Sequence, residues 1–200
     1  MNKTRLEAFS DGVIAILITI MVLDLHSPSG TDASALAGTL PALATYLLSF
    51  VFLGIYWNNH HHLLHATSHI NGVVLWANLH LLFWLSLVPF ATRWMSETEF
   101  AAVPTAAYGA VLLLSAVAFT ILVRAIIACQ PPESVLVKAI GNDAKGRISL
   151  VLYLVAVPLT FVNRWLSVAI FALVALIWFV PDRRIESRLN ARVRTDSAAD

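Results

Sequence analysis

Long apolar runs separated by short polar segments make up most of the chain. Six of these runs are apolar enough to predict membrane-spanning helices. The predicted helices cover residues 4–25, 39–62, 70–94, 104–128, 147–162 and 166–180. The pattern therefore predicts an all-α membrane protein, with a single transmembrane domain over residues 1–182. Residues 183–200 are expected to form a tail that is first basic and then polar.

The segments between the runs contain the residues typical of turns. Residues 26–32 hold Pro, Gly and Ser, and two prolines end the fourth run at residues 131–132. The longest connection runs from these prolines to Gly146, and we expect a short amphipathic helix in it. The fifth and sixth runs are short and are separated only by residues 163–165, which predicts a tight helical hairpin.

The first run is too short to cross a membrane by itself. Residues 13–23 would cover about 16 Å as a helix, whereas the hydrocarbon layer is about 30 Å thick. The spanning helix must therefore include the preceding turns, which bring Ser10 and Asp11 close to the membrane. A carboxylate there is costly unless it faces protein or water and has a partner. We therefore expect this helix to lie inside a bundle.

Composition supports a polytopic membrane protein with little mass outside the bilayer. Hydrophobic residues make up 58% of the chain and charged residues 12%, against about 25% charged residues in soluble domains. The mean hydropathy is +0.76. The single cysteine, Cys129, excludes an intrachain disulfide. We do not interpret the N-terminus as a signal peptide, because Asp11 interrupts the apolar run and no small-residue cleavage site follows.

The distribution of basic residues predicts the orientation in the membrane. If the N-terminus is cytoplasmic, most lysines and arginines fall on the cytoplasmic side. These are Lys3, Arg5, Arg124, Lys138, Lys145, Arg147, Arg183, Arg184, Arg188, Arg192 and Arg194. The far side carries two basic residues, Arg93 and Arg164. It also carries the acidic residues Asp24, Asp32, Glu97 and Glu99. This asymmetry predicts six spans with both termini cytoplasmic.

A histidine cluster closes the second predicted span. It contains His60, His61, His62, His65 and His69. The spacing i, i+4, i+8 of residues 61, 65 and 69 would place them on one helix face, and such spacing suits a transition metal. No cysteine or carboxylate accompanies them locally, so we predict no metal site and favour a hydrated helix end. Sensitivity to pH stays open, since the histidine pKa is ordinarily about 6.5.

Further polar residues fall at the same predicted membrane level as the histidines. The topology places the start of the first span beside the end of the second and the start of the third. A single hydrogen-bonded network is therefore expected from Arg5, Ser10, Asp11, Trp57, His60 and Asn78. Carboxamides in spans usually form hydrogen bonds across helices. We favour a structural clamp that joins three helices over a catalytic role.

An apolar stripe follows this polar cluster in the first span. Ile16, Ile20 and Leu23 lie at i, i+4 and i+7 on one helix face, with Thr19 adjacent. Ordinary helix packing or lipid contact explains such a stripe. Alternatively, in a symmetric pore it would form stacked apolar rings able to gate by dewetting. The pattern alone leaves both open. The chain contains no Thr-Val-Gly-Tyr-Gly filter sequence.

Three segments resemble the transmembrane protein 175 family of potassium channels. The first is Arg5-x-x-x-Phe9-Ser10-Asp11, which is similar to the family signature. Residues 56–64 resemble the second-helix Trp-x-x-His segment, and residues 78–90 resemble the third helix with its terminal Pro-Phe. The resemblance covers about the first 95 residues, and the remainder agrees only in the number of spans. The departures are Leu64, where an aromatic residue is common, and the triple histidine.

The resemblance implies a six-helix subunit and a homotetramer whose first helices line the pore. It implies a constriction at Ile16, further apolar rings at Ile20 and Leu23, and a link between Thr19 and selectivity. It also implies a structural polar network of Arg5, Phe9, Ser10, Asp11, Trp57, His60 and Asn78. The expected function is passive, potassium-permeable cation conduction in the bacterial inner membrane. The expected partners are lipid, monovalent cations and further copies of the chain, with no nucleic acid and no cofactor besides permeant K⁺.

Other functional classes fit the sequence less well. A histidine-dependent metal or proton transporter is the alternative, but metal transport needs mid-span carboxylates or histidines, and the later spans offer almost none. We predict that the chain is not an enzyme, because no nucleophile with its base and no phosphate-binding loop is present. A scaffold protein would be distinguished from a channel by ion flux after reconstitution.

Overall fold

The computed structural model describes residues 3–28, 30–131 and 144–179. Three expectations lie wholly or largely outside these residues. They are the amphipathic helix before Gly146, the position of Lys138, and the tail over residues 183–200 with its arginines.

The regular structure of the described residues is entirely helical, which confirms that the chain is all-α as predicted. The elements are α1 (Lys3–Ile20), η1 (Met21–Asp24), α2 (Ala33–Ala37), α3 (Leu40–His65), α4 (Gly72–Ser86), α5 (Val88–Glu97), α6 (Ala102–Cys129), α8 (Ala144–Leu159) and α9 (Arg164–Phe179). The 3₁₀ turn η1 directly follows α1. The described residues of the predicted polar loop, 26–28 and 30–32, form no helix, whereas α2 itself was not predicted.

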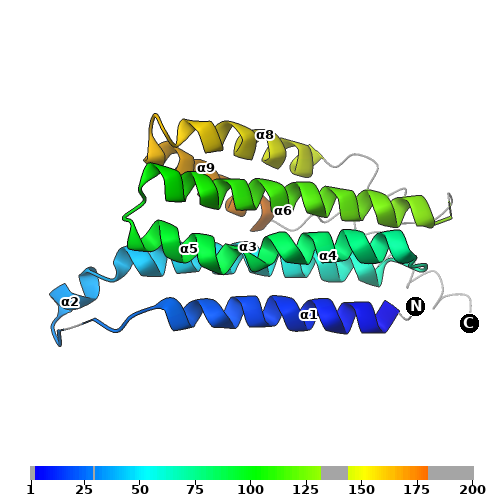
Figure 1. Ribbon diagram of the computed structural model, residues 1–200, viewed down its shortest axis with the longest axis horizontal. Coiled ribbons are helices and arrows are strands. Elements are labelled where there is room, and N and C mark those ends of the chain that lie inside the picture. Colours follow the sequence, from blue (N-terminus) through cyan, green and yellow to red (C-terminus); the bar gives the residue numbers. More distant parts are fainter. Residues whose placement is uncertain (1–2, 29, 132–143, 180–200) are drawn as a thin grey trace, which may run out of the picture.

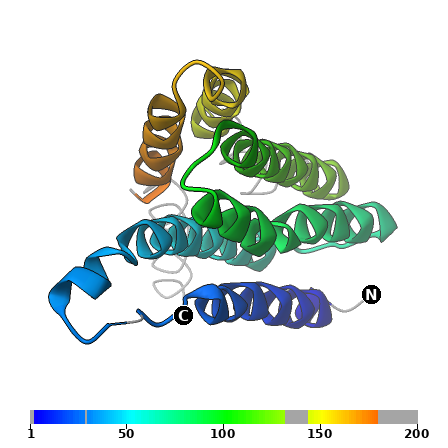
Figure 2. The ribbon, with the colours of Figure 1, turned by 60° about the vertical axis from the view of Figure 1, so that its left-hand side comes forward.

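The helices form a layered bundle with α1 at one edge (Figures 1 and 2). Helix α1 packs on α3 and α4, α6 packs on α4, α5 and α8, and α8 and α9 form a hairpin on the far side. Among the described residues, the helix that carries the predicted pore residues therefore packs on the others along one side.

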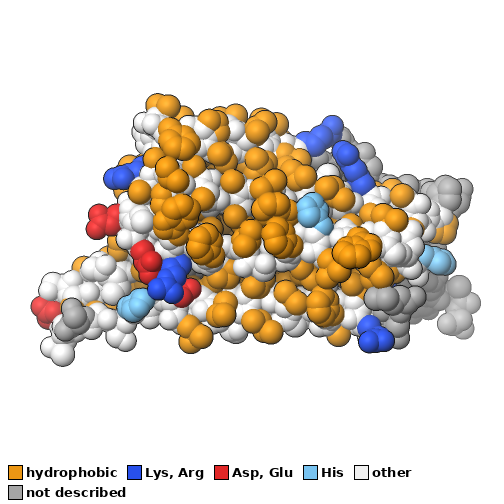
Figure 3. Space-filling model, viewed as in Figure 1, with side chains coloured by type: hydrophobic (Ala, Val, Ile, Leu, Met, Phe, Trp, Pro, Cys, Tyr) orange, Lys and Arg blue, Asp and Glu red, His pale blue; other side chains and the backbone are white. Residues whose placement is uncertain are grey.

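Four helical stretches are long and apolar enough to cross a membrane. They are Lys3–Asp24, Leu40–His65, Gly72–Glu97 and Ala102–Cys129. Helices α8 and α9 have 16 residues each, about 24 Å at 1.5 Å per residue. Apolar side chains cover the middle of the face in Figure 3, and charged ones gather toward its two ends. An apolar middle between charged ends is the distribution expected of a helix bundle that spans a hydrocarbon layer.

The third predicted helix is in fact two helices, α4 and α5. They meet at Leu87, which caps both. The cause is Pro89, because proline has no backbone N–H to donate to the preceding turn. At the other end, the Asn71 side chain accepts a 3.0 Å hydrogen bond from the backbone N–H of Val74, so α4 begins two residues later than predicted.

The predicted hairpin between the last two spans is confirmed, with its turn shifted toward the N-terminus. The turn covers residues 160–163, because Asn163 Oδ1 accepts hydrogen bonds from the backbone N–H groups of Trp165 and Leu166 at 3.1 and 3.2 Å and so caps α9. Gly109 in α6 allows α9 to approach closely: a Cβ atom there would lie 2.6 Å from Phe171 Cζ.

Candidate pore-lining helix and its anchors

Helix α1 has two faces of different character. One face is buried against α3 and α4 and includes Ile14 and Leu17. The other is exposed and carries Ile16 and Ile20, which are 62% and 44% accessible, and the predicted stripe continues into η1 with Leu23, which is 78% accessible. A helix with large apolar side chains on its free side needs a further apolar surface, either lipid or protein, to cover them.

Thr19 lies on the exposed side of α1 with the stripe. Its hydroxyl lies 3.0 Å from the carbonyl oxygen of Ala15 and 3.1 Å from that of Ile16, and donates to them. The hydroxyl proton is thereby directed at the helix backbone. The lone pairs of the oxygen remain available to a cation on the exposed side.

A buried chain of hydrogen bonds ties the first half of α1 to α3 and α4. The side-chain N–H of Asn78 donates to Ser10 Oγ at 2.9 Å, and Asn78 Oδ1 lies 2.7 Å from His60 Nε2. Because Oδ1 can only accept, His60 Nε2 must carry the proton. All three side chains are buried. His60 Nδ1 has no hydrogen-bond partner among the described residues.

A separate hydrogen bond joins α1 to α3: the Trp57 indole N–H donates to Asp11 Oδ1 at 3.0 Å. Within the described residues these side chains therefore form two separate groups and not the predicted single network. Arg5 and Phe9 belong to neither and are exposed. The reason is helical phase, since successive residues are rotated by about 100°. Ser10 and Asp11 therefore face different neighbours, and Arg5 lies away from both.

The histidine cluster also departs from the prediction. Trp57, His61 and His65 stack along α3, with ring centroids 6.0 and 6.1 Å apart. His69, however, lies beyond the end of α3, and its carbonyl oxygen accepts a 2.9 Å hydrogen bond from the side chain of Gln130. The i+8 spacing therefore does not continue the helix face. The described residues hold no group of three or more His, Cys, Asp or Glu side chains arranged to bind a metal.

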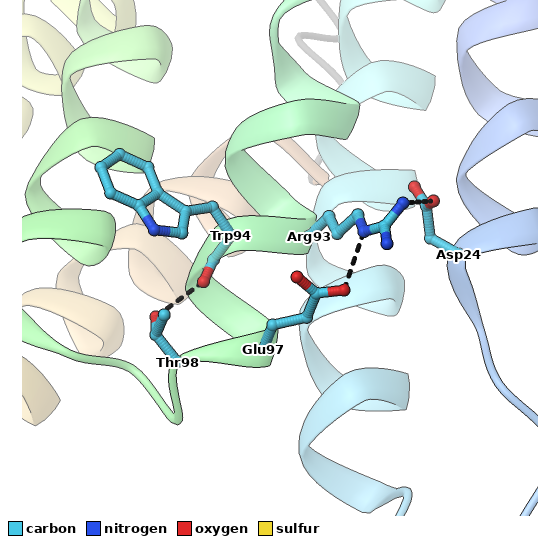
Figure 4. A network of polar contacts seen from close by, with 5 residues as sticks. All are labelled: Asp24, Arg93, Trp94, Glu97 and Thr98. Atoms are coloured by element: carbon cyan, nitrogen blue, oxygen red, sulfur yellow. Dashed lines mark hydrogen bonds and ion pairs between the residues drawn. The ribbon is translucent and has the colours of Figure 1, made fainter.

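A charged cluster that was not predicted lies at the other end of α1 (Figure 4). Arg93 of α5 forms an ion pair with Asp24 of η1 at 3.2 Å and another with Glu97 at 2.8 Å. The i, i+4 spacing of Arg93 and Glu97 could have predicted their pairing. Nothing in the sequence pairs Arg93 with Asp24, because that contact depends on how α1 and α5 pack.

A buried hydroxyl cluster was also missed. Ser49 Oγ lies 2.7 Å from Thr92 Oγ1 and 3.0 Å from the Tyr108 hydroxyl, which joins α3, α5 and α6. All three side chains are buried. Short hydroxyl side chains in apolar runs are common, so the sequence offered no signal that these three meet.

Comparison with known proteins connects this geometry to a family. The family model described as endosomal/lysosomal potassium channel TMEM175 matches residues 5–89, which include most of α1 and all of α3 and α4 with their anchors. A protein of Chryseobacterium sp. (strain P1-3), named as a potassium channel, is 50% identical over 190 residues that cover 95% of this chain and 99% of that protein. The chain belongs to the TMEM175 family.

A solved structure extends the TMEM175 likeness beyond the first helices. The crystal structure of a lysosomal potassium-selective channel TMEM175 homolog from Chamaesiphon minutus matches with a TM-score of 0.77 and 30% identity, over 89% of this chain and 96% of that one. The human endosomal/lysosomal proton channel TMEM175 is 35% identical over 96 residues, which cover 42% of this chain and 19% of the human protein. With its several apolar helices, the chain is a multi-pass protein of the cell membrane.

Proposed function

We propose that the chain is the subunit of a potassium-permeable channel that conducts K⁺ passively across the cell membrane. Four copies surround the pore, each contributing α1. The observation that carries the proposal is the exposed stripe of Ile16, Ile20 and Leu23 on a helix held by polar anchors on its opposite side. The bacterial relatives named as potassium channels support the same function.

In this proposal Ile16 forms the constriction. Four isoleucine side chains around an axis make a dry neck, in which water and ions are unstable until the helices separate or rotate. Ile20 and Leu23 add two further apolar rings. Such a neck gates the pore by dewetting and needs no carbonyl filter.

Thr19 contributes selectivity in this proposal. Its hydroxyl oxygen lies on the same side of α1 as the stripe, and its proton is held by the backbone. The oxygen replaces part of the water shell of a passing ion. Potassium gives up its water more readily than sodium, so partial dehydration favours K⁺.

The same proposal includes six spans per subunit with both termini in the cytoplasm. Helices α8 and α9 supply the fifth and sixth spans, and their length of about 24 Å requires locally thinned lipid or flanking residues to complete the crossing. The bias of lysines and arginines along the sequence supports the orientation. Arg5 and Phe9 lie on the exposed side of α1, where a neighbouring copy completes their contacts.

The test is ion flux from liposomes that contain the purified protein and a potassium gradient. We expect Ile16→Asn to increase the K⁺ flux several-fold, because a polar side chain hydrates the neck. Val22→Asn is the matched control: Val22 is also exposed, but it lies in η1 and does not belong to the apolar stripe, so the variant should leave the flux unchanged. An unchanged or smaller flux in Ile16→Asn would contradict the proposed neck.

A histidine-dependent proton transporter is the second candidate. It is favoured by the animal relatives, which are named as proton channels, and by the stacked pair of His61 and His65 on the exposed side of α3. The same liposomes with a pH-sensitive dye separate the two functions. Proton flux that persists without K⁺ and is lost in His61→Gln/His65→Gln would support the second candidate.

A further inference from the structure

Two polar side chains lie on exposed helix faces that are otherwise largely apolar. Asn58 is exposed on α3, on the same side as the exposed Leu47 and Phe50. His80 is exposed on α4, on the same side as the exposed Phe83. Both residues lie inside helical stretches that are long and apolar enough to cross a membrane. A polar group that faces lipid without a partner is unfavourable, so both side chains need one.

The two side chains offer complementary hydrogen-bonding groups. The Trp84 indole N–H donates to His80 Nε2 at 2.9 Å. Because Nε2 accepts this bond, the proton of the neutral ring lies on Nδ1. Within the described residues this Nδ1–H has no acceptor, and the Asn58 carboxamide forms no hydrogen bond. His80 thus offers a donor, and Asn58 Oδ1 offers an acceptor.

Asn58 and His80 lie at the same level of the bundle. Helices α3 and α4 run in opposite directions (Figure 1), and the contact between His60 and Asn78 fixes their register. Asn58 precedes His60 by two residues, and His80 follows Asn78 by two residues. Both are therefore displaced from that contact by about 3 Å in the same direction.

The two side chains point to different sides of the subunit. Two residues correspond to a rotation of about 200° around a helix. Because His60 and Asn78 face each other, Asn58 points away from α4 and His80 points away from α3. Helix α1 packs on both α3 and α4 and lies at the edge of the bundle (Figures 1 and 2). One subunit by itself therefore cannot join the two groups.

We propose that His80 Nδ1–H of one copy donates a hydrogen bond to Asn58 Oδ1 of the next copy around the pore. This inference rests on the proposed ring of four copies around α1. In such a ring each copy turns its α3 side to one neighbour and its α4 side to the other, a head-to-tail contact that rotation closes. Rotation about an axis parallel to the helices preserves the level of each residue, so the two groups meet.

The surroundings of the pair support the same contact. Gly54 precedes Asn58 by four residues, and Trp84 follows His80 by four residues, so Gly54 and Trp84 also share one level. A Cβ atom at Gly54 would meet no atom within 4 Å. The α3 side therefore has open space at the level where the next copy presents the Trp84 ring.

Cysteine cross-linking of the purified full-length protein tests the contact. In a Cys129→Ser background, which removes the native thiol, Asn58→Cys/His80→Cys treated with a short bifunctional thiol reagent should give linked dimers, trimers and tetramers. Either cysteine alone should give none, because a head-to-tail contact does not pair a residue with its own copy. Asn58→Cys/Leu154→Cys is the matched control: Leu154 is exposed on α8 at the far side of the bundle, and this pair should remain unlinked.

The oligomeric state separates the possible failures of this test. A tetramer on size-exclusion chromatography that gives no cross-link between positions 58 and 80 would overturn this contact and leave the proposed channel assembly intact. The absence of a tetramer would overturn the proposed assembly, and this contact with it.

Leucine variants test the hydrogen bond itself. Asn58→Leu or His80→Leu alone leaves a polar group unpaired between copies and should lower the tetramer yield several-fold, whereas Asn58→Leu/His80→Leu should restore most of it. Trp84→Phe is the matched control, because it removes only the indole bond to His80, and should leave the yield unchanged. If both groups faced lipid instead, each single leucine variant would keep or raise the yield, which would refute the contact.

Discussion

The two ends of α1 are held by different chemistry. Near its start, Ser10, Asn78 and His60 form neutral hydrogen bonds and are fully buried. At its far end, the ion pairs of Arg93 with Asp24 and Glu97 are exposed, with about half of the Arg93 side chain accessible. Both groups join α1 to neighbouring helices, yet one excludes water and the other does not.

This contrast indicates which anchor determines the position of α1. An exposed ion pair contributes only about 0–1 kcal/mol, because water competes with it and salt screens it. A buried hydrogen bond contributes about 1 kcal/mol, but an unpaired buried group costs about 1–3 kcal/mol. Loss of a partner therefore destabilises the buried anchor, whereas water can replace a lost partner in the exposed anchor at little cost. We expect the proposed pore helix to be fixed at its start and adjustable at its far end.

The largest effect is expected for Asn78→Leu. The change leaves the Ser10 hydroxyl and the His60 Nε2–H without partners at the same time. We expect a loss of about 3 kcal/mol in the free energy of unfolding, measured as a lower midpoint of thermal unfolding in detergent.

The control for Asn78→Leu replaces the whole anchor. In the triple variant Ser10→Ala/His60→Leu/Asn78→Leu no unpaired group remains, so much of the lost stability should return. A triple variant less stable than Asn78→Leu alone would show that shape, and not hydrogen bonding, makes this contact important.

An intermediate effect is expected for Trp57→Phe. The variant keeps a ring on α3 but removes the indole N–H that donates to Asp11. Because Trp57 and Asp11 are only partly buried, water replaces the lost donor, and we expect a loss of about 1 kcal/mol in the same unfolding measurement. A loss as large as that of Asn78→Leu would contradict the distinction between the two groups.

A small effect is expected for Arg93→Gln. Removing the guanidinium breaks the ion pairs with Asp24 and Glu97, which should cost under about 1 kcal/mol and less at high salt. Thermal unfolding at low and high salt measures both. If the cost were unaffected by salt, the contact would have to be shielded from water, for example by a neighbouring copy.

The smallest effect on the stability of the subunit is expected for Arg5→Ala. Arg5 is exposed and belongs to neither anchor, so its loss should leave the unfolding of the subunit unchanged. Because we place its contacts in a neighbouring copy, the yield of tetramer on size-exclusion chromatography should fall. Asp11→Asn should lower both the tetramer yield and the subunit stability. A normal tetramer yield for Arg5→Ala would show that Arg5 makes no contact needed for assembly.

Parts of this site were predictable because they depend on local spacing. The phase of Ile16 and Ile20 on α1 follows from 3.6 residues per turn, and both are exposed as expected, as is Leu23 in η1. The contact of Ser10, His60 and Asn78 followed from placing three helix ends at one level. The break at Leu87 was missed, although Pro89 was visible, because a proline in an apolar run either kinks a helix or ends it.

The amino-acid sequence by itself determined that this chain is an all-α membrane protein of the TMEM175 family, with an apolar stripe on its first helix. Hydropathy and helical periodicity depend only on residues near one another in the chain, so both features follow from the sequence without knowledge of the fold. Only the tertiary structure decided that the polar cluster divides into two groups and that Arg93 reaches Asp24. Such contacts depend on the rotation of each helix against its neighbours, which is set by the packing of many side chains at once.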